Sequence, residues 1–334
     1  MSEANAMLAD WLGLTLDGES PATTQGRLPF GRYRIHGPGI LELTPNDLHP
    51  RAHAVIVSAG IHGNETGPIE LVGELLARLE AGLLRLGAPT LIILGNLPSI
   101  RAGQRFCETN LNRLFRRDLK ASGNEPQRAR ELMAAVDAFY ARHPQPRLHY
   151  DLHTAIRDSR YPRFAVDPYA DTVTRAEQWR WFSAAGIQAV LHQHQHSWTF
   201  SHYSKHYHQA QAFTMELGKV HPFGANDLAA LRPMRQLLEA LIEGREPPGD
   251  DPDVLKYFKV EHELMRESED FRLCFPDETP NFSEFSVGTR LSYDAKAGEF
   301  IVTEQPLAVV FPNANVELGA RAALLVRTTS TPQN

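Results

Sequence analysis

Apolar runs typical of buried strands alternate with helical patterns over most of this chain. Short, almost wholly apolar runs are typical of strands covered on both faces, whereas apolar residues at helical spacing indicate surface helices. The alternation predicts a mostly parallel sheet with helices on both faces. The expected strands lie at 53–59, 90–95, 148–153, 188–192 and 212–217, and the expected helices at 66–85, 125–143, 176–185 and 226–243, the last interrupted or restarted at Pro233.

The pattern changes at a Pro- and Gly-rich linker, residues 246–252. Beyond it we expect only short strands separated by turn signals, at 257–264, 288–293, 299–301, 307–311 and 323–327. The predicted fold class is therefore α/β, a mixed, mostly parallel sheet flanked by helices, with a small C-terminal all-β domain. The predicted domains are 1–246, of which 1–48 form a strand-rich N-terminal segment, and 253–334.

Composition narrows the class of protein. The net charge of −6 over 334 residues argues against a nucleic-acid or membrane partner, although a locally basic site for a small anion remains compatible. The two cysteines, Cys107 and Cys274, are too few for a disulfide framework. No apolar run approaches the roughly 20 residues that cross a bilayer. We expect a soluble, cytoplasmic protein; the sequence does not decide between a monomer and a homo-oligomer.

Three residues form a candidate metal site. His62 and Glu65 follow the strand that ends near residue 59, and His153 closes the strand 148–153. Two imidazoles and one carboxylate form a known catalytic zinc set, which leaves a coordination position for water and brings that water's pKa to about 7. Each part also occurs by chance as an ordinary surface pair or strand-end histidine. Asp151 faces the same way as His153 by strand alternation and is a candidate for orienting it.

Glu216 lies in an otherwise apolar strand, where a carboxylate is costly unless it is paired or functional. The functional interpretation is a general base and then a general acid; the alternative is an edge-strand glutamate that faces solvent. Arg105 is a candidate for stabilising an oxyanion, and Asn112 with Arg113 for gripping a carboxylate. The alternative for these arginines is a basic surface run.

Two further groups of cationic or metal-binding residues have weaker support. Arg157, Arg160 and Arg163 follow His153 and could serve a second carboxylate, but a solvated loop explains them equally well. The histidines between residues 192 and 208 could suggest a second metal site. Because no acid or cysteine lies among them, we expect a loop that lines or flanks the cleft instead. These histidines are at positions 192, 194, 196, 202, 206 and 208.

Taken together, these segments resemble the aspartoacylase/succinylglutamate desuccinylase family of zinc carboxypeptidase-like enzymes, over essentially the whole chain. The resemblance rests on HGNETGPIE (62–70), RFCETNLNRLF (105–115), DLHTAIR (151–157), TMELGKV (214–220) and FPNANVELGARA (311–322). DLHTAIR, ELGKV and the overall length favour the succinylglutamate branch.

The resemblance implies one Zn²⁺ per subunit, held by His62, Glu65 and His153, with Glu216 as the catalytic carboxylate. It implies that Arg105 polarises the scissile carbonyl and that Asn112 and Arg113 bind the substrate's α-carboxylate. The implied reaction is hydrolysis of N2-succinyl-L-glutamate to succinate and L-glutamate, the last step of the arginine succinyltransferase pathway of arginine catabolism.

The implied substrate is a small anionic N-acyl amino acid with three carboxylates, so the site needs additional cationic contacts. Arg157 is the candidate for one of them. Two alternatives stay open: an aspartoacylase-like deacylase of another N-acyl amino acid, and a zinc-containing binding module without catalysis.

Overall fold

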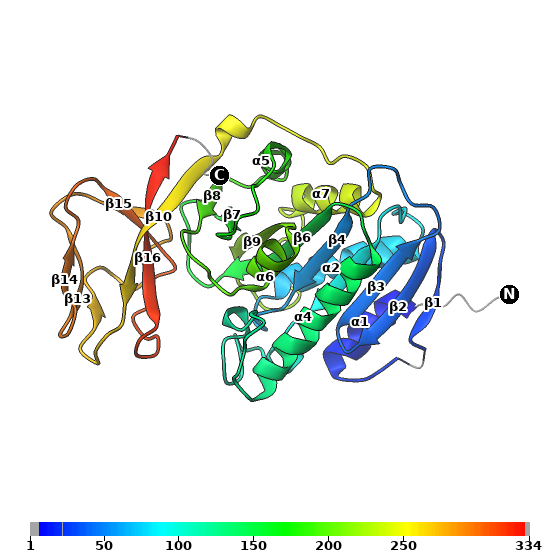
Figure 1. Ribbon diagram of the computed structural model, residues 1–334, viewed down its shortest axis with the longest axis horizontal. Helices are drawn as coiled ribbons and strands as arrows, with labels where there is room; N and C mark the ends of the chain where they lie inside the picture. Colours follow the sequence, from blue (N-terminus) through cyan, green and yellow to red (C-terminus); the bar gives the residue numbers. More distant parts are fainter. Residues whose placement is uncertain (1–6, 22, 331–334) are drawn as a thin grey trace.

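The computed structural model of the protein describes residues 7–21 and 23–330, so residues 1–6, 22 and 331–334 of the two predicted domains lie outside the described residues. One large sheet of 13 strands extends through this part of the chain (Figure 1). Its order is β1-β2-β3-β5-β4-β6-β9-β7-β8-β10-β16-β15-β12. The strands are β1 (Gln25–Leu28), β2 (Gly31–Gly37), β3 (Ile40–Pro45), β4 (Ala54–Ala59), β5 (Thr90–Leu94), β6 (Arg147–Ala155), β7 (Arg163–Asp167), β8 (Ala189–His192), β9 (Gln211–Lys219), β10 (Lys256–Met265), β12 (Ser283–Phe285), β15 (Leu307–Val310) and β16 (Arg321–Thr329).

The centre of the sheet is parallel. β5, β4, β6 and β9 run parallel to one another, and β7 is antiparallel to β9. Every residue of β4 and β5 is buried, which explains why these strands are continuous apolar runs without alternation. The mixed sheet flanked by helices that the sequence predicts is confirmed, but the parallel pairing is concentrated in the middle of the sheet, whereas the strands toward both ends pair antiparallel. Because the parallel strands end at one edge, their carboxyl ends bring loops from distant parts of the sequence together.

Helices cover both faces of this sheet. One face carries α1 (Met7–Asp17), α2 (Thr66–Glu80), α3 (Leu97–Ala102), α5 (Ala176–Ala184) and α7 (Arg232–Ile242), whose side chains share one apolar cluster. The other face carries α4 (Asn124–Arg142) and α6 (Phe200–His208). The expected helix at 226–243 begins only at Arg232, with Pro233 in its first turn, where a missing N–H does no harm.

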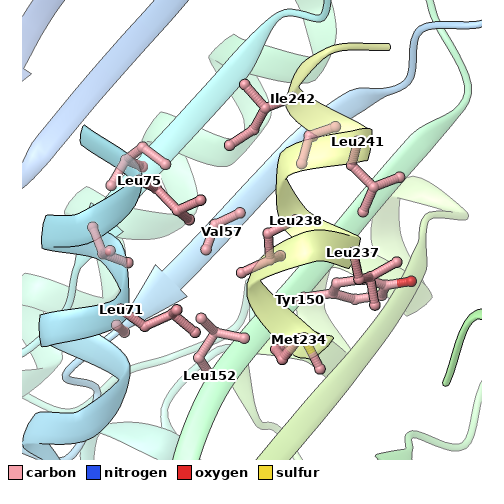
Figure 2. Packing of buried hydrophobic residues seen from close by; sticks show 14 of the residues in the cluster. Val57, Leu71, Leu75, Tyr150, Leu152, Met234, Leu237, Leu238, Leu241 and Ile242 are labelled. Carbon is pink, nitrogen blue, oxygen red and sulfur yellow. The ribbon is translucent and has the colours of Figure 1, made fainter. Parts of the chain in front are cut away.

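Helix α7 shows how the core is built (Figure 2). Its apolar face, with Leu238 fully buried, packs over Val57 of β4 and Leu152 of β6, beside Leu75 of α2. Fully burying a leucine side chain contributes roughly 1.5–3 kcal/mol. This layer holds β4 and β6 in place, and those two strands lead to the candidate metal ligands.

The C-terminal part contains strands and the short 3-10 helix η2 (Pro252–Val254). A second sheet, of order β11-β13-β14, comprises β11 (Arg272–Leu273), β13 (Arg290–Asp294) and β14 (Gly298–Ile301). The first strand of this part, β10, pairs in parallel with β8, from Lys256 opposite Ala189 to Lys259 opposite His192. The C-terminal β structure is thus joined to the large sheet by backbone hydrogen bonds.

The histidine-rich stretch corrects a prediction. Residues 200–208 were expected to form a loop but form helix α6, whose N-cap Thr199 accepts a hydrogen bond from the backbone of His202. β8 ends at His192, so His194 and His196 lie outside any strand. Among residues 7–21 and 23–330, no helix combines the length and the apolarity that a bilayer-spanning segment requires.

Candidate metal centre and catalytic site

The three candidate metal ligands converge at the carboxyl ends of the central strands. His62 follows β4 by three residues, Glu65 precedes α2, and His153 lies near the end of β6. Glu216 lies in β9 directly opposite His153 in the register of the two strands. The sheet therefore brings together residues that are far apart in the sequence.

Glycine shapes the loop that carries His62. Gly60 has a φ of 67°, a conformation that side chains rarely adopt. At Gly63, a Cβ atom would lie 2.1 Å from the carbonyl carbon of Ser99, at α3. Only glycine fits such a close approach, and the backbone N–H of Gly63 donates to the carbonyl of Arg105 at 3.2 Å. The loop is thus packed tightly between the metal ligands and the segment that carries Arg105.

His62, Glu65 and His153 are all buried, and each offers one ligand atom within 4.8 Å of the others. Nδ1 of His62 lies 2.8 Å from Oε1 of Glu65, and Nδ1 of His153 lies 2.9 Å from Oε2 of the same carboxylate. The backbone N–H of Thr154 also donates to Oε2 of Glu65, at 3.1 Å. The carboxylate is therefore held between the two rings.

Hydrogen bonds to the far side of each ring fix which nitrogen can bind a metal. Nε2 of His62 lies 3.1 Å from Oδ1 of Asn110, and Nε2 of His153 lies 2.9 Å from Oδ2 of Asp151. Both partners are acceptors, so each Nε2 carries the proton and the lone pair of each neutral ring is on Nδ1. Two such lone pairs facing a carboxylate repel it unless a cation lies between them. The donor set fits a metal ion bound by Nδ1 of both rings and by Glu65.

Electrostatics in this cluster agree with that fit. Burial, and next the nearby Arg105, lowers the pKa of His62 to about 4, so this ring is neutral near pH 7. Burial would also lower the pKa of His153, but the carboxylates of Asp151 and Glu65 outweigh it and raise that pKa well above its ordinary value. The pair of carboxylates around His153 thus attracts positive charge.

A chain of buried hydrogen bonds continues behind His153. Ser58 donates to Oδ1 of Asp151 at 2.5 Å, and its hydroxyl lies 2.8 Å from Nε2 of His149. Nδ1 of His149 lies 2.7 Å from the hydroxyl of Ser204 on α6. Asp151 is predicted from the sequence as the residue that orients His153, whereas Asn110, Ser58 and His149 are not. Strand alternation could have found His149, which shares its face of β6 with Asp151 and His153.

Glu216 is 7% exposed and lies in the interior of the sheet, because β9 is flanked by β6 and β7. The alternative of an edge-strand glutamate facing solvent is therefore wrong. Among the described residues, Oε2 of Glu216 is buried without a hydrogen-bond partner. Burial raises the pKa of this carboxyl to about 7, partly opposed by His153 and Arg105 and reinforced by Glu65. A carboxyl group with such a pKa can both accept and release a proton near neutral pH.

Arg105, Asn112 and Arg113 surround the cluster. Arg105 donates from Nη1 to Oε1 of Glu65 at 2.8 Å. Asn112, in the short 3-10 helix η1 (Leu111–Arg113), is buried, and its Nδ2 lies 3.5 Å from Nε2 of His153. Oδ1 of Asn112 accepts from the backbone N–H of Phe200 at 2.9 Å. These contacts place both the guanidinium and the amide at the candidate metal centre.

Arg113 is accessible to solvent, and its Nη1 donates to the backbone carbonyl of Asn112 at 2.7 Å. Protein atoms crowd its guanidinium and lower its pKa to about 9, and the neighbouring Arg321 and Arg105 lower it further. An accessible guanidinium among other cations, closely surrounded by protein, can bind an anion. Arg321 belongs to β16 and is paired at 3.2 Å with Glu263 of β10, so the C-terminal part places both a guanidinium and a carboxylate near Arg113.

The arginines after His153 are placed differently. Arg163 donates from Nε to the backbone carbonyl of Gly186 at 3.0 Å, a structural contact between the start of β7 and the turn after α5. Arg160 is exposed and contacts the hydroxyl of Ser283 at 3.4 Å. Arg157 is half-buried and forms no hydrogen bond or ion pair with any residue in the described ranges. The structure does not bring Arg157 into the cluster of Glu65, so its role stays a prediction.

Comparisons with known proteins give a family and a function class. Residues 51–242 match the family model described as succinylglutamate desuccinylase/aspartoacylase catalytic domain, and residues 253–329 match the AstE/AspA barrel-sandwich hybrid domain. A succinylglutamate desuccinylase of Pseudomonas paraeruginosa is 43% identical over 326 residues, which cover 96% of this chain and 98% of that protein.

Solved structures agree with these matches. The succinylglutamate desuccinylase of Vibrio parahaemolyticus superposes with a TM-score of 0.88 at 34% identity, covering 95% of this chain and 94% of that chain. The enzyme of Chromobacterium violaceum gives a TM-score of 0.84 at 34% identity, covering 97% and 98%. Both matches extend over the large sheet and the C-terminal β structure alike.

Proposed function

The chain belongs to the succinylglutamate desuccinylase/aspartoacylase family, and on this premise we propose that it hydrolyses the amide bond of N2-succinyl-L-glutamate to succinate and L-glutamate. The protein is a hydrolase that acts on an amide. The choice of substrate is supported by the near-full-length similarity to succinylglutamate desuccinylases. In this proposal the reaction is the last step of the arginine succinyltransferase pathway, and the working units are residues 1–246 and 253–334.

One observation carries the chemistry: the unpartnered, buried carboxylate of Glu216 lies beside a buried cluster of two imidazoles and a carboxylate. We assign His62, Glu65 and His153 as the ligands of one Zn²⁺. A zinc ion bound there would supply Lewis-acid polarisation of the scissile carbonyl and would lower the pKa of a coordinated water.

The remaining steps fall to side chains of the chain itself. Glu216 accepts a proton from the attacking water as the carbon–oxygen bond forms, and it passes that proton to the glutamate nitrogen as the carbon–nitrogen bond breaks. Arg105 donates a hydrogen bond to the carbonyl oxygen as negative charge develops on that oxygen. This bond replaces the one that its Nη1 donates to Glu65 in the free protein. Asp151 and Asn110 hold the two imidazoles in the ligating tautomer.

Substrate binding uses the arginines around the cluster. Arg113 binds the α-carboxylate of the glutamate moiety through two parallel hydrogen bonds from its guanidinium, a bidentate contact, and Asn112 binds the same carboxylate through its side-chain amide. Arg157 is assigned to a further carboxylate of this triply anionic substrate. Both assignments rest on the accessibility of the guanidiniums and on the family resemblance.

The test is amino-acid release from N2-succinylglutamate, N-succinylaspartate, N-acetylglutamate and N-acetylaspartate, before and after the zinc is stripped and restored. We expect a zinc-dependent preference for succinylglutamate. Zinc-dependent turnover of another member of the set would keep the mechanism and change the substrate. No turnover of any of the four by zinc-loaded protein would refute the proposed function.

A further inference from the structure

A second group of metal-binding side chains lies outside the site described above. His196 belongs to the segment between β8 and α6, and His202 and His206 lie one helical turn apart on α6. Each offers one ligand atom within 4.8 Å of the others. Histidines at i and i+4 present their rings on one helix face, which is a common way for a helix to hold a metal ion. None of the three has a role in the proposed hydrolysis.

The rings are already oriented toward one another. Nδ1 of His196 lies 2.9 Å from Nε2 of His202. The rings of His202 and His206 are stacked at 14° with centroids 5.2 Å apart, and those of His196 and His206 are 4.7 Å apart. Trp198 stacks on His196 at 27° and packs its edge against His202. The indole thus forms an apolar wall on one side of the three imidazoles.

Ordinary packing satisfies these polar rings only in part. Within the described ranges, Nδ1 of His202 is buried without a partner, and the ring of His206 makes no hydrogen bond with another residue. Three imidazoles this close cannot all be protonated, because like charges repel. Burial, with His196 and His206, lowers the pKa of His202 to about 3. The cations that act on His206 and His202 are Arg117 and Lys205, and each is paired with a carboxylate, Arg117 with Asp137 at 3.5 Å and Lys205 with Asp167.

We propose that His196, His202 and His206 form a second metal site, which binds a late first-row divalent ion such as Zn²⁺ or Cu²⁺. Neutral imidazoles suit these ions, whereas Mg²⁺ and Ca²⁺ prefer oxygen ligands. Three protein ligands leave further coordination positions for water. The affinity order follows the general one, with Cu²⁺ bound more tightly than Zn²⁺.

The position of the site links it to the catalytic residues. The carbonyl of Trp198 accepts a hydrogen bond from the backbone N–H of Phe115 at 3.1 Å, and the N–H of Phe200 donates to the side chain of Asn112. A metal bound by His196 and the two helix histidines would fasten the Trp198 segment to α6. It would therefore stabilise the segment that carries Asn112.

The test counts zinc ions. Chelator-treated protein is dialysed against buffered Zn²⁺, and bound zinc per chain is measured by elemental mass spectrometry for the wild type, His206→Ala, His196→Ala and His62→Ala. His194→Ala is the matched control, since His194 is an exposed histidine of the same segment outside the cluster. Melting temperatures measured without zinc establish that each variant folds.

We expect two zinc ions on the wild type and on His194→Ala, one on His206→Ala and His196→Ala, and one on His62→Ala. Zinc should also raise the melting temperature of His62→Ala more than that of the His62→Ala/His206→Ala double variant. An ion lost with His206→Ala but kept in His62→Ala supports this site even if the proposed hydrolysis fails. One ion on the wild type, two ions on both His206→Ala and His196→Ala, or an equal loss in His194→Ala would overturn it.

Discussion

Replacing the carboxylate of Glu216 by an amide should remove catalysis and at the same time stabilise the metal-free fold. Burial raises the pKa of this carboxyl from its ordinary 4.5 to about 7, so the folded protein keeps the proton over a range of pH in which the unfolded chain releases it. The wild type therefore loses stability as the pH rises from about 4.5 to about 7. One pH unit corresponds to roughly 1.4 kcal/mol, so the full loss is about 3 kcal/mol.

The Glu216→Gln variant does not titrate, so its advantage over the wild type should grow from about 1 kcal/mol or less near pH 5 to about 3 kcal/mol at pH 7 and above. Any penalty for burying an unpartnered amide is independent of pH and cancels in this comparison. The assay is denaturant unfolding of both metal-free proteins at about pH 5 and about pH 8. Glu284→Gln, an exposed strand position, is the control.

Turnover by the zinc-loaded Glu216→Gln variant should fall by roughly 10²–10⁴-fold, the usual contribution of a general acid–base group, with zinc content unchanged. A stability difference that is the same at both pH values would refute the argument from burial. Wild-type turnover would remove Glu216 from the mechanism.

Three further predictions concern single side chains. Arg113→Ala should lower kcat/KM for N2-succinylglutamate by roughly 100-fold, which corresponds to the loss of about 3 kcal/mol for a charged contact. It should barely change kcat/KM for an analogue whose α-carboxylate is replaced by an amide. Equal losses on both substrates would contradict the assignment of Arg113 to the α-carboxylate. Asp151→Asn should weaken zinc affinity by roughly 10–100-fold in a competition titration with a chelating dye, because the amide is uncharged and has only one acceptor oxygen for both Ser58 and His153. An unchanged affinity would remove Asp151 from that role. Burial raises the pKa of Glu42, but hydrogen bonds with His143, Arg142 and His36 outweigh burial and lower that pKa to about 2. The contribution of Glu42 to stability is therefore present above pH 4.5 and is lost as the pH falls toward 2. Acid unfolding of Glu42→Gln should lack that part of the pH dependence, and coincident curves for variant and wild type would contradict it.

The parts of the fold that the sequence predicts are those in which apolar residues dominate the packing. β4 and β5 are continuous apolar runs because both faces of the sheet are covered. Runs of this kind indicate parallel strands, and the carboxyl ends of parallel strands lie at one edge of the sheet. The residues at the ends of β4 and β6 could therefore be placed together from the sequence. The candidate ligands His62, Glu65 and His153 were recognisable as a set because each lies at or shortly after the carboxyl end of a predicted central strand.

Helix α6 could not be predicted in this way, since its buried face is polar. Ser201 bonds to Thr214, Ser204 to His149, and Lys205 forms a buried ion pair with Asp167. A hydrophobic period therefore does not appear in FSHYSKHYH, although most of these residues are buried. Asn110 was missed for a related reason, because its side chain both caps the backbone of Asn112 and contacts His62, and only the first of these is visible as a local pattern.

The junction between β8 and β10 determines which motions can admit the substrate. Because β10 continues the large sheet through a parallel ladder, a hinge rotation of the C-terminal part would have to break backbone hydrogen bonds from Lys256 to Lys259. Such a rotation is far more expensive than the rearrangement of surface loops. The parallel ladder therefore ties the C-terminal part to the large sheet as a continuous structure, and a hinge between the two is not the means by which the candidate site opens.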